Sequence, residues 1–113
     1  MTMSTEISRD ELTALLVSDP PVLLEALGEP YFRKGHLPGA KQIDYLQVID
    51  QVSAMQIAPD APIVVYCASD TCKNSHLAAE ALVGAGYANV RVYAEGKAGW
   101  QHAGLTLVRD GSR

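Results

Sequence analysis

The most informative segment of the sequence is IVVYCASDTCKNSHLAAEALVGAG, residues 63–86. Its first four residues are apolar, continuous and mostly β-branched, a pattern typical of a strand that is covered on both faces of a sheet. A polar loop over residues 67–74 follows, and the Ala- and Leu-rich segment 75–85 predicts a helix that ends at Gly86. The stretch therefore predicts a strand–loop–helix unit with Cys67 at the end of the strand.

Weaker patterns on either side extend this unit into a domain. Ser8 and Glu11 have the spacing of a capping box, which predicts a short helix over residues 9–17. A second helix, at 45–55, is indicated by apolar residues at 46, 49 and 52, and a third is expected at 96–102. Further strands are expected at 21–27, 41–43 and 89–93, with a terminal extended segment at 105–108. Alternating strands and helices indicate an α/β domain with a central, mostly parallel sheet.

Composition limits the classes of protein to consider. A chain of 113 residues has room for a single domain over residues 1–113, and 48% hydrophobic with 19% charged residues argues against disorder. The formal charge of −4 gives no reason to expect nucleic acid or a membrane surface as partner. The start of the chain lacks the pattern of a secretory signal, and no apolar stretch approaches the ~18 residues of a membrane span, so a cytoplasmic location is expected. No cofactor is expected.

The position of Cys67 suggests a reactive thiol rather than a buried structural one. Ligand sites in parallel sheets lie outside the carboxyl ends of the strands. The free backbone N–H groups of the loop and of the first helical turn, together with the helix dipole, favour a thiolate there. The same groups would hold an anion such as thiosulfate or departing sulfite, and Lys73 is a candidate for additional positive charge. Such a cysteine can take up a sulfane sulfur as a persulfide and pass it to a second thiol or to cyanide.

The chain resembles the rhodanese homology family over roughly residues 22–108. The resemblance is carried by four segments in the family's order: YFRKGHLPGA at 31–40, IVVYC at 63–67, AAEALVGAGYANV at 78–90, and EGKAGWQHAGL at 95–105. It implies a small α/β sandwich around a parallel sheet and a sulfurtransferase that carries a persulfide on Cys67. It also implies that backbone N–H groups of the following loop cradle the sulfur; that loop is Ala68, Ser69, Asp70, Thr71, Cys72, Lys73 and Asn74.

The partners that the resemblance implies are small: thiosulfate or a similar sulfur donor, and a thiol or cyanide as acceptor, with a protein persulfide as a further candidate. Two further residues of the matching segments are assigned structural roles. His36 is expected to stabilise its turn by a hydrogen bond, and Trp100 is expected to pack in the core.

Three features depart from the family pattern. The family's loop, C-x-x-G-x-R followed by Ser, is here about two residues longer and lacks both glycine and arginine; Lys73 is the candidate substitute, but it cannot bind an oxyanion as a fork. Cys72, within the loop, would pair with Cys67 if their Cα atoms came within about 4.4–6.8 Å, or would serve as a resolving or alternative thiol. The family's Asp-x-Arg pair is replaced by Glu25-Ala26-Leu27, which should affect local packing.

Other functions remain open at this point. A phosphatase or arsenate reductase of the same fold would use the spacing from Cys67 to Lys73, although Lys replaces the arginine on which phosphoryl transfer depends. A non-catalytic binding module, or a thiol-redox module using Cys67 and Cys72, is the alternative from another class. A metal site built from Cys67, Cys72 and His76 is disfavoured because structural zinc prefers four ligands.

Overall fold

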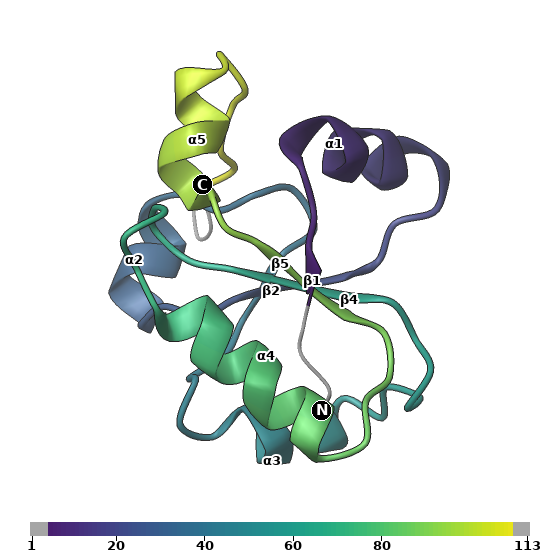
Figure 1. Ribbon diagram of the computed structural model, residues 1–113. Coiled ribbons are helices and arrows are strands. Elements are labelled where there is room, and N and C mark those ends of the chain that lie inside the picture. The colour runs from purple at the N-terminus through teal and green to yellow at the C-terminus, as the bar shows by residue number, and fades with distance from the viewer. Residues whose placement is uncertain (1–4, 110–113) are drawn as a thin grey trace.

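A five-stranded parallel sheet forms the centre of the structure, a computed structural model that describes residues 5–109 (Figure 1). In order of sequence the strands are β1 (Thr5–Glu6), β2 (Val22–Glu25), β3 (Lys41–Gln42), β4 (Ile63–Tyr66) and β5 (Val90–Tyr93). Their spatial order is β1-β5-β4-β2-β3, and all four neighbouring pairs are parallel. The predicted α/β architecture is therefore confirmed. β4 lies in the middle and all four of its residues are buried, as its apolar sequence predicts.

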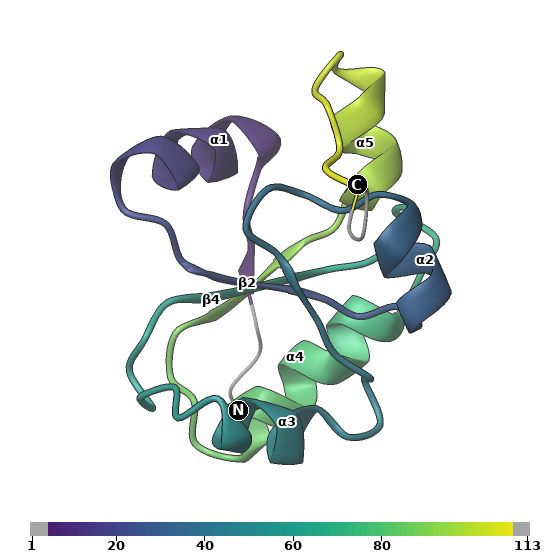
Figure 2. The ribbon, with the colours of Figure 1, turned by 180° about the vertical axis from the view of Figure 1, so that it is seen from behind.

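Helices cover both faces of this sheet. They are α1 (Arg9–Ser18), α2 (Glu29–Lys34), α3 (Val48–Ala54), α4 (Asn74–Gly84) and α5 (Gly96–His102). Figures 1 and 2 show α1 and α5 on one face and α3 and α4 on the other, while α2 lies near the end of the sheet from which α4 starts. None of the helices within residues 5–109 combines the length and apolar character that a bilayer crossing requires.

The alternation of side chains along β4 divides the core into two clusters. Val64 and Tyr66 pack with the α1 and α5 side, which includes Leu12 and Trp100. Ile63 and Val65 belong to the cluster on the α3 and α4 side, which is completed chiefly by residues of those helices and of the neighbouring strands: Leu24, Ile43, Val48, Val52, Ala78, Ala79, Leu82, Val90 and Val92. Successive residues of a strand point to opposite faces of the sheet. The Cys67 side chain therefore points to the α4 side, opposite to the side chain of Tyr66.

The structure corrects the predicted helix at 45–55. The helix begins only at Val48, and its buried residues are Val48 and Val52, four positions apart. Leu46 precedes the helix in a turn and is 77% exposed, and Ile49 is 44% exposed. The predicted apolar face of this helix was therefore wrong. Its spacing was counted from Leu46, and a residue outside the helix does not show which side of the helix is buried.

Two short elements were absent from the prediction. β1 contains two residues and is held by parallel pairing with Arg91 and Val92 of β5. α2 has six residues and begins after Gly28 with a proline in its first turn. The expected extended segment 105–108 forms no strand of the sheet; it makes an isolated antiparallel bridge between Val108 and His36, and its Leu105 and Leu107 pack against the core. The helix predicted at 9–17 is confirmed as α1, with Ser8 Oγ accepting a hydrogen bond of 3.1 Å from the Glu11 N–H.

The connections of the sheet place a site at the carboxyl ends of β2 and β4. From β2 the chain proceeds to β3 at one edge, and from β4 it proceeds to β5 on the opposite side. Loops that leave neighbouring strands in opposite directions open a crevice at their carboxyl ends. Glu25 and Tyr66, the last residues of β2 and β4, are paired in register there, and Cys67 comes next.

Candidate functional site

The backbone of Cys67 is fixed by the start of α5. The Lys97 N–H donates to the Cys67 carbonyl oxygen at 3.0 Å, and the Ala98 N–H donates to the Ala68 carbonyl oxygen at 2.8 Å. This close approach requires glycine at position 96, where φ is +65° and an added Cβ would overlap the Cys67 carbonyl oxygen. Two segments about thirty residues apart in sequence thus hold the cysteine in place.

The side chain of Cys67 faces the first turn of α4. Its Sγ lies 3.5 Å from Ser75 Oγ, and both residues are 1% exposed. No side chain caps the helix at Lys73, so the N–H groups of its first turn keep their partial positive charge. A hydroxyl and a helix N-terminus beside the sulfur both favour the thiolate over the thiol. Ser75 was recognised in the sequence only as the start of the helix, not as a neighbour of the sulfur.

We expect Ser75→Ala to slow alkylation of reduced Cys67 by iodoacetamide at neutral pH about tenfold. A hydrogen bond to a charged group contributes about 1.5 kcal/mol, and its loss reduces the thiolate population by that factor. The measurement uses the Cys72→Ser background, in which Cys67 is the sole thiol. Ser18→Ala removes a hydroxyl bonded to the Ala14 carbonyl on α1 and should leave the rate unchanged. Equal rates in Ser75→Ala and its parent would remove Ser75 from the site.

Cys67 and Cys72 are joined as a disulfide in this structure, with their Cα atoms 6.3 Å apart. This separation lies within the range that a disulfide spans. The loop folds back because the Cys72 N–H donates to the Ser69 carbonyl oxygen at 3.1 Å, which closes a turn over residues 69–72. A cystine sulfur does not titrate and does not attack, so any nucleophilic chemistry at Cys67 requires reduction of the pair.

The other residues of the predicted substrate-binding loop differ in their exposure and in their hydrogen bonds. Asp70, Thr71 and Lys73 are exposed, and Lys73 forms no ion pair among the residues that the structure describes. Ser69 Oγ and Thr71 Oγ1 are hydrogen bonded to each other at 2.9 Å. Asn74 acts as a structural tie, since its Nδ2 donates to the Ala26 carbonyl oxygen at 3.1 Å and joins the start of α4 to the end of β2.

A buried ion pair that the sequence did not reveal joins the end of β2 to the start of α5. Lys97 Nζ contacts Glu25 Oε2 at 3.1 Å, with side chains 13% and 0% exposed. Nζ also donates to the carbonyl oxygens of Tyr31 and Gly35, at 3.0 and 2.8 Å. The same lysine supplies the backbone N–H that binds the Cys67 carbonyl, so the ion pair and the cysteine share one residue.

Tyr66 completes this network from β4. Its hydroxyl donates to Glu25 Oε1 at 2.7 Å and accepts from the Leu37 N–H at 3.0 Å. Burial first, and then the charge of Glu25, raise the pKa of Tyr66 far above its ordinary value. The phenol therefore remains a donor at any physiological pH. At the position of the family's Asp-x-Arg pair, the Glu25 carboxylate thus accepts hydrogen bonds from both Tyr66 and Lys97.

His36 and Trp100 take the structural roles expected of them. His36 Nδ1 donates to the Leu37 carbonyl oxygen at 2.9 Å, and its ring stacks on Phe32 with centroids 4.0 Å apart. Trp100 is 4% exposed, and its Nε1 donates to the Thr106 carbonyl oxygen at 3.2 Å.

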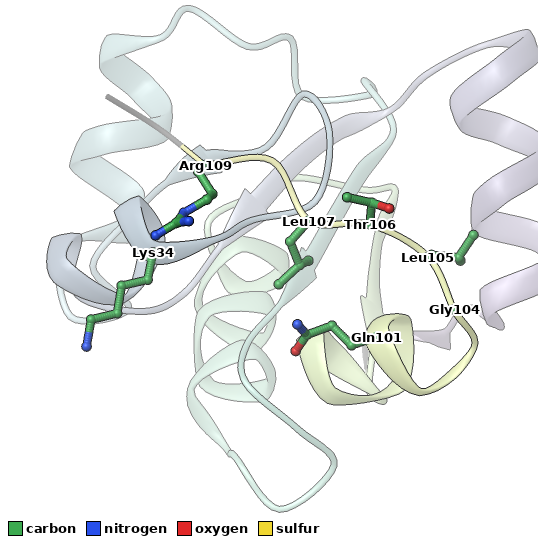
Figure 3. Close-up of a pocket in the computed structure, with 7 residues that line it drawn as sticks. All are labelled: Lys34, Gln101, Gly104, Leu105, Thr106, Leu107 and Arg109. Carbon is green, nitrogen blue, oxygen red and sulfur yellow. The ribbon is translucent and has the colours of Figure 1, made fainter. Parts of the chain in front are cut away.

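A hollow of about 420 Å³ is lined by residues of α2, of α5 and of the segment that follows α5 (Figure 3). In Figure 3 the side chains of Lys34 and Arg109 lie at one end of it, and the rest of its wall is Gln101, Gly104, Leu105, Thr106 and Leu107. No residue of the loop 67–74 contributes to this wall, so the hollow is separate from the cysteine. Within residues 5–109, no group of three or more His, Cys, Asp or Glu side chains is arranged to hold a metal ion.

The chain is similar in sequence to known proteins. The family model of the Rhodanese-like domain matches residues 8–103. The uncharacterized protein YibN of Escherichia coli (strain K12) is 33% identical over 105 residues, which cover 91% of this chain and 71% of that protein.

Two solved structures show the same fold. A thiosulfate sulfurtransferase from Pseudomonas aeruginosa superposes with a TM-score of 0.85 at 24% identity, over 97% of this chain but only 21% of the other. The Alr3790 protein from Anabaena sp. superposes with a TM-score of 0.83 at 22% identity, over 94% of each chain. This chain thus spans about a fifth of the Pseudomonas protein and nearly the whole of the Anabaena one.

Proposed function

The chain belongs to the Rhodanese-like domain family, and from this premise we propose that it is a sulfurtransferase whose sulfur carrier is Cys67. The observation that carries the proposal is the position of the cysteine. Its backbone is clamped by α5 at the carboxyl end of β4, and its sulfur lies beside Ser75 at the uncapped start of α4. The proposed setting is a reducing compartment such as the cytoplasm, since the carrier acts as a thiol.

The proposed first step is attack of the Cys67 thiolate on the outer sulfur of thiosulfate or a similar donor. A bond forms between Cys67 Sγ and that sulfur, the S–S bond of thiosulfate breaks, and sulfite leaves with the electron pair. The uncapped N–H groups at the start of α4 favour negative charge on the thiolate, on the persulfide and on the departing sulfite. In a second step the persulfide passes its outer sulfur to a thiol or to cyanide.

We expect the fully reduced protein, freed of reductant and held without oxygen, to release about one sulfite per chain on addition of thiosulfate. Cys67→Ser should release none, while Cys72→Ser should release as much as the unaltered protein. Sulfite is measured directly, so the result does not depend on the later fate of the persulfide. Release by Cys67→Ser together with its loss in Cys72→Ser would assign the carrier to Cys72.

The disulfide favours one second candidate, a thiol-redox module that exchanges the Cys67–Cys72 pair with other thiols. Such a module would be reduced by a dithiol and reoxidised by a disulfide, with no sulfite released from thiosulfate. A phosphatase of this fold would instead hydrolyse an aryl phosphate. The sulfite measurement separates both from the sulfurtransferase.

A further inference from the structure

The loop after Cys67 is longer than in the family pattern, and it places the sulfur of Cys72 against the sulfur of Cys67. The turn over residues 69–72, closed by the hydrogen bond from Cys72 N–H to Ser69, returns the chain toward the end of β4. As a result Cys72 Sγ meets Cys67 Sγ itself. The residues by which this loop exceeds the family pattern therefore position a thiol against the inner sulfur of any persulfide formed on Cys67.

The two cysteines differ in access. Cys67 is 1% exposed, whereas Cys72 is half-buried and lies in a loop whose neighbours Thr71 and Lys73 are exposed. An acceptor thiol from solution must diffuse to the sulfur, while Cys72 is held in place five residues away. A reacting group held in the same molecule has an effective concentration that free thiols do not reach.

Resting on the proposed sulfurtransferase function, we propose that Cys72 is the resolving cysteine and discharges the persulfide as hydrosulfide. The Cys72 thiolate attacks Cys67 Sγ and forms the Cys67–Cys72 disulfide, while the bond from Cys67 Sγ to the outer sulfur breaks and that sulfur leaves as hydrosulfide with the electron pair. The sulfane sulfur gains two electrons, and the two cysteine thiols lose them. A dithiol reductant then reopens the disulfide, so on this route the acceptor thiol is supplied by Cys72 and a dithiol is the co-substrate.

The pairing suits one direction of attack. Attack on the outer sulfur would transfer the persulfide to Cys72 and require the two Sγ atoms to be separated by a sulfur. In the structure the two Sγ atoms are in direct contact, and this geometry suits attack on the inner sulfur. Hydrosulfide, a weak base, is a suitable leaving group for this displacement.

The test is a single turnover of the full chain. Reduced protein is desalted without oxygen and mixed with thiosulfate, and sulfite, sulfide and intact mass are then measured for the unaltered protein, Cys72→Ser and Cys67→Ser. The unaltered protein should release about one sulfite and one sulfide per chain and finish about 2 Da lighter than its reduced form. Cys72→Ser should release sulfite but no sulfide and finish about 32 Da heavier.

The two proposals fail in different ways. If the unaltered protein releases sulfite yet keeps the additional 32 Da and yields no sulfide, Cys67 is a carrier and Cys72 does not resolve it. If sulfide appears equally from Cys72→Ser, the intramolecular step is also overturned. If neither protein releases sulfite, the sulfurtransferase function itself is wrong and the resolving role falls with it. Sulfite release by Cys72→Ser shows at the same time that this variant is folded.

Discussion

Replacing Lys97 with Met is expected to lower the free energy of unfolding by about 3–5 kcal/mol, because it leaves the carboxylate of Glu25 buried without its cation. Glu25 is fully buried and Lys97 nearly so, and Nζ also binds the carbonyl oxygens of Tyr31 and Gly35. The substitution therefore removes several charge-assisted hydrogen bonds together. Methionine keeps the length and apolar stem of the side chain, so the loss measures the charge rather than the packing.

Arg91→Met provides the matched control for this prediction. Arg91 binds Glu11 with two contacts of 2.8 Å, but both side chains are partly exposed, at 28% and 50%. An ion pair in contact with water contributes far less to stability than a buried one loses when it is broken, so Arg91→Met should have only a small effect. Urea unfolding followed by circular dichroism gives both values. Equal losses of unfolding free energy in the two variants would show that the Glu25–Lys97 pair stabilises the fold no more than an exposed ion pair does.

Replacing Gly96 with Ala is expected to lower the free energy of unfolding by about 2–5 kcal/mol and to reduce sulfite release at least tenfold. A residue with a side chain at φ +65° costs about 1–2 kcal/mol by itself. The Cβ would also overlap the Cys67 carbonyl oxygen and lie 2.8 Å from the Ser69 nitrogen. Both neighbours are backbone atoms, so the start of α5 and the cysteine loop must separate. That movement breaks the Lys97 N–H bond that fixes Cys67.

Gly39→Ala separates the two causes. Gly39 has φ +81° but no atom within 4 Å of an added Cβ. Its substitution should cost only the conformational part, about 1–2 kcal/mol, with sulfite release unchanged. Thermal unfolding and the sulfite measurement are made on both variants. A Gly96→Ala protein with the stability and activity of Gly39→Ala would contradict the close approach of α5 to the cysteine.

The parts of the fold that the sequence predicts are those with a local cause. Residues 63–66 form a strand because four consecutive apolar, mostly β-branched residues suit a position covered on both faces. The placement of Cys67 between this strand and a helix follows from the polarity of residues 68–74 alone. α1 was predictable because Ser8 caps it through a hydrogen bond within one turn.

The parts that were missed depend on contacts between distant residues. Glu25 and Lys97 are 72 positions apart, and nothing in either local sequence indicates that they meet. β1 is a strand only because β5 offers it hydrogen bonds, since two residues carry no periodicity. The contact between Cys67 and Ser75 depends on how far the loop folds back, which its length leaves undetermined.

The most direct test of the central claim follows the transferred sulfur atom itself. Thiosulfate labelled with ³⁵S in its outer position is mixed with the reduced Cys72→Ser protein, in which Cys67 is the sole cysteine. We predict that about one labelled atom per chain stays with the protein after gel filtration and is released by dithiothreitol. Absence of bound label, or equal labelling of a protein that lacks both cysteines, would contradict it.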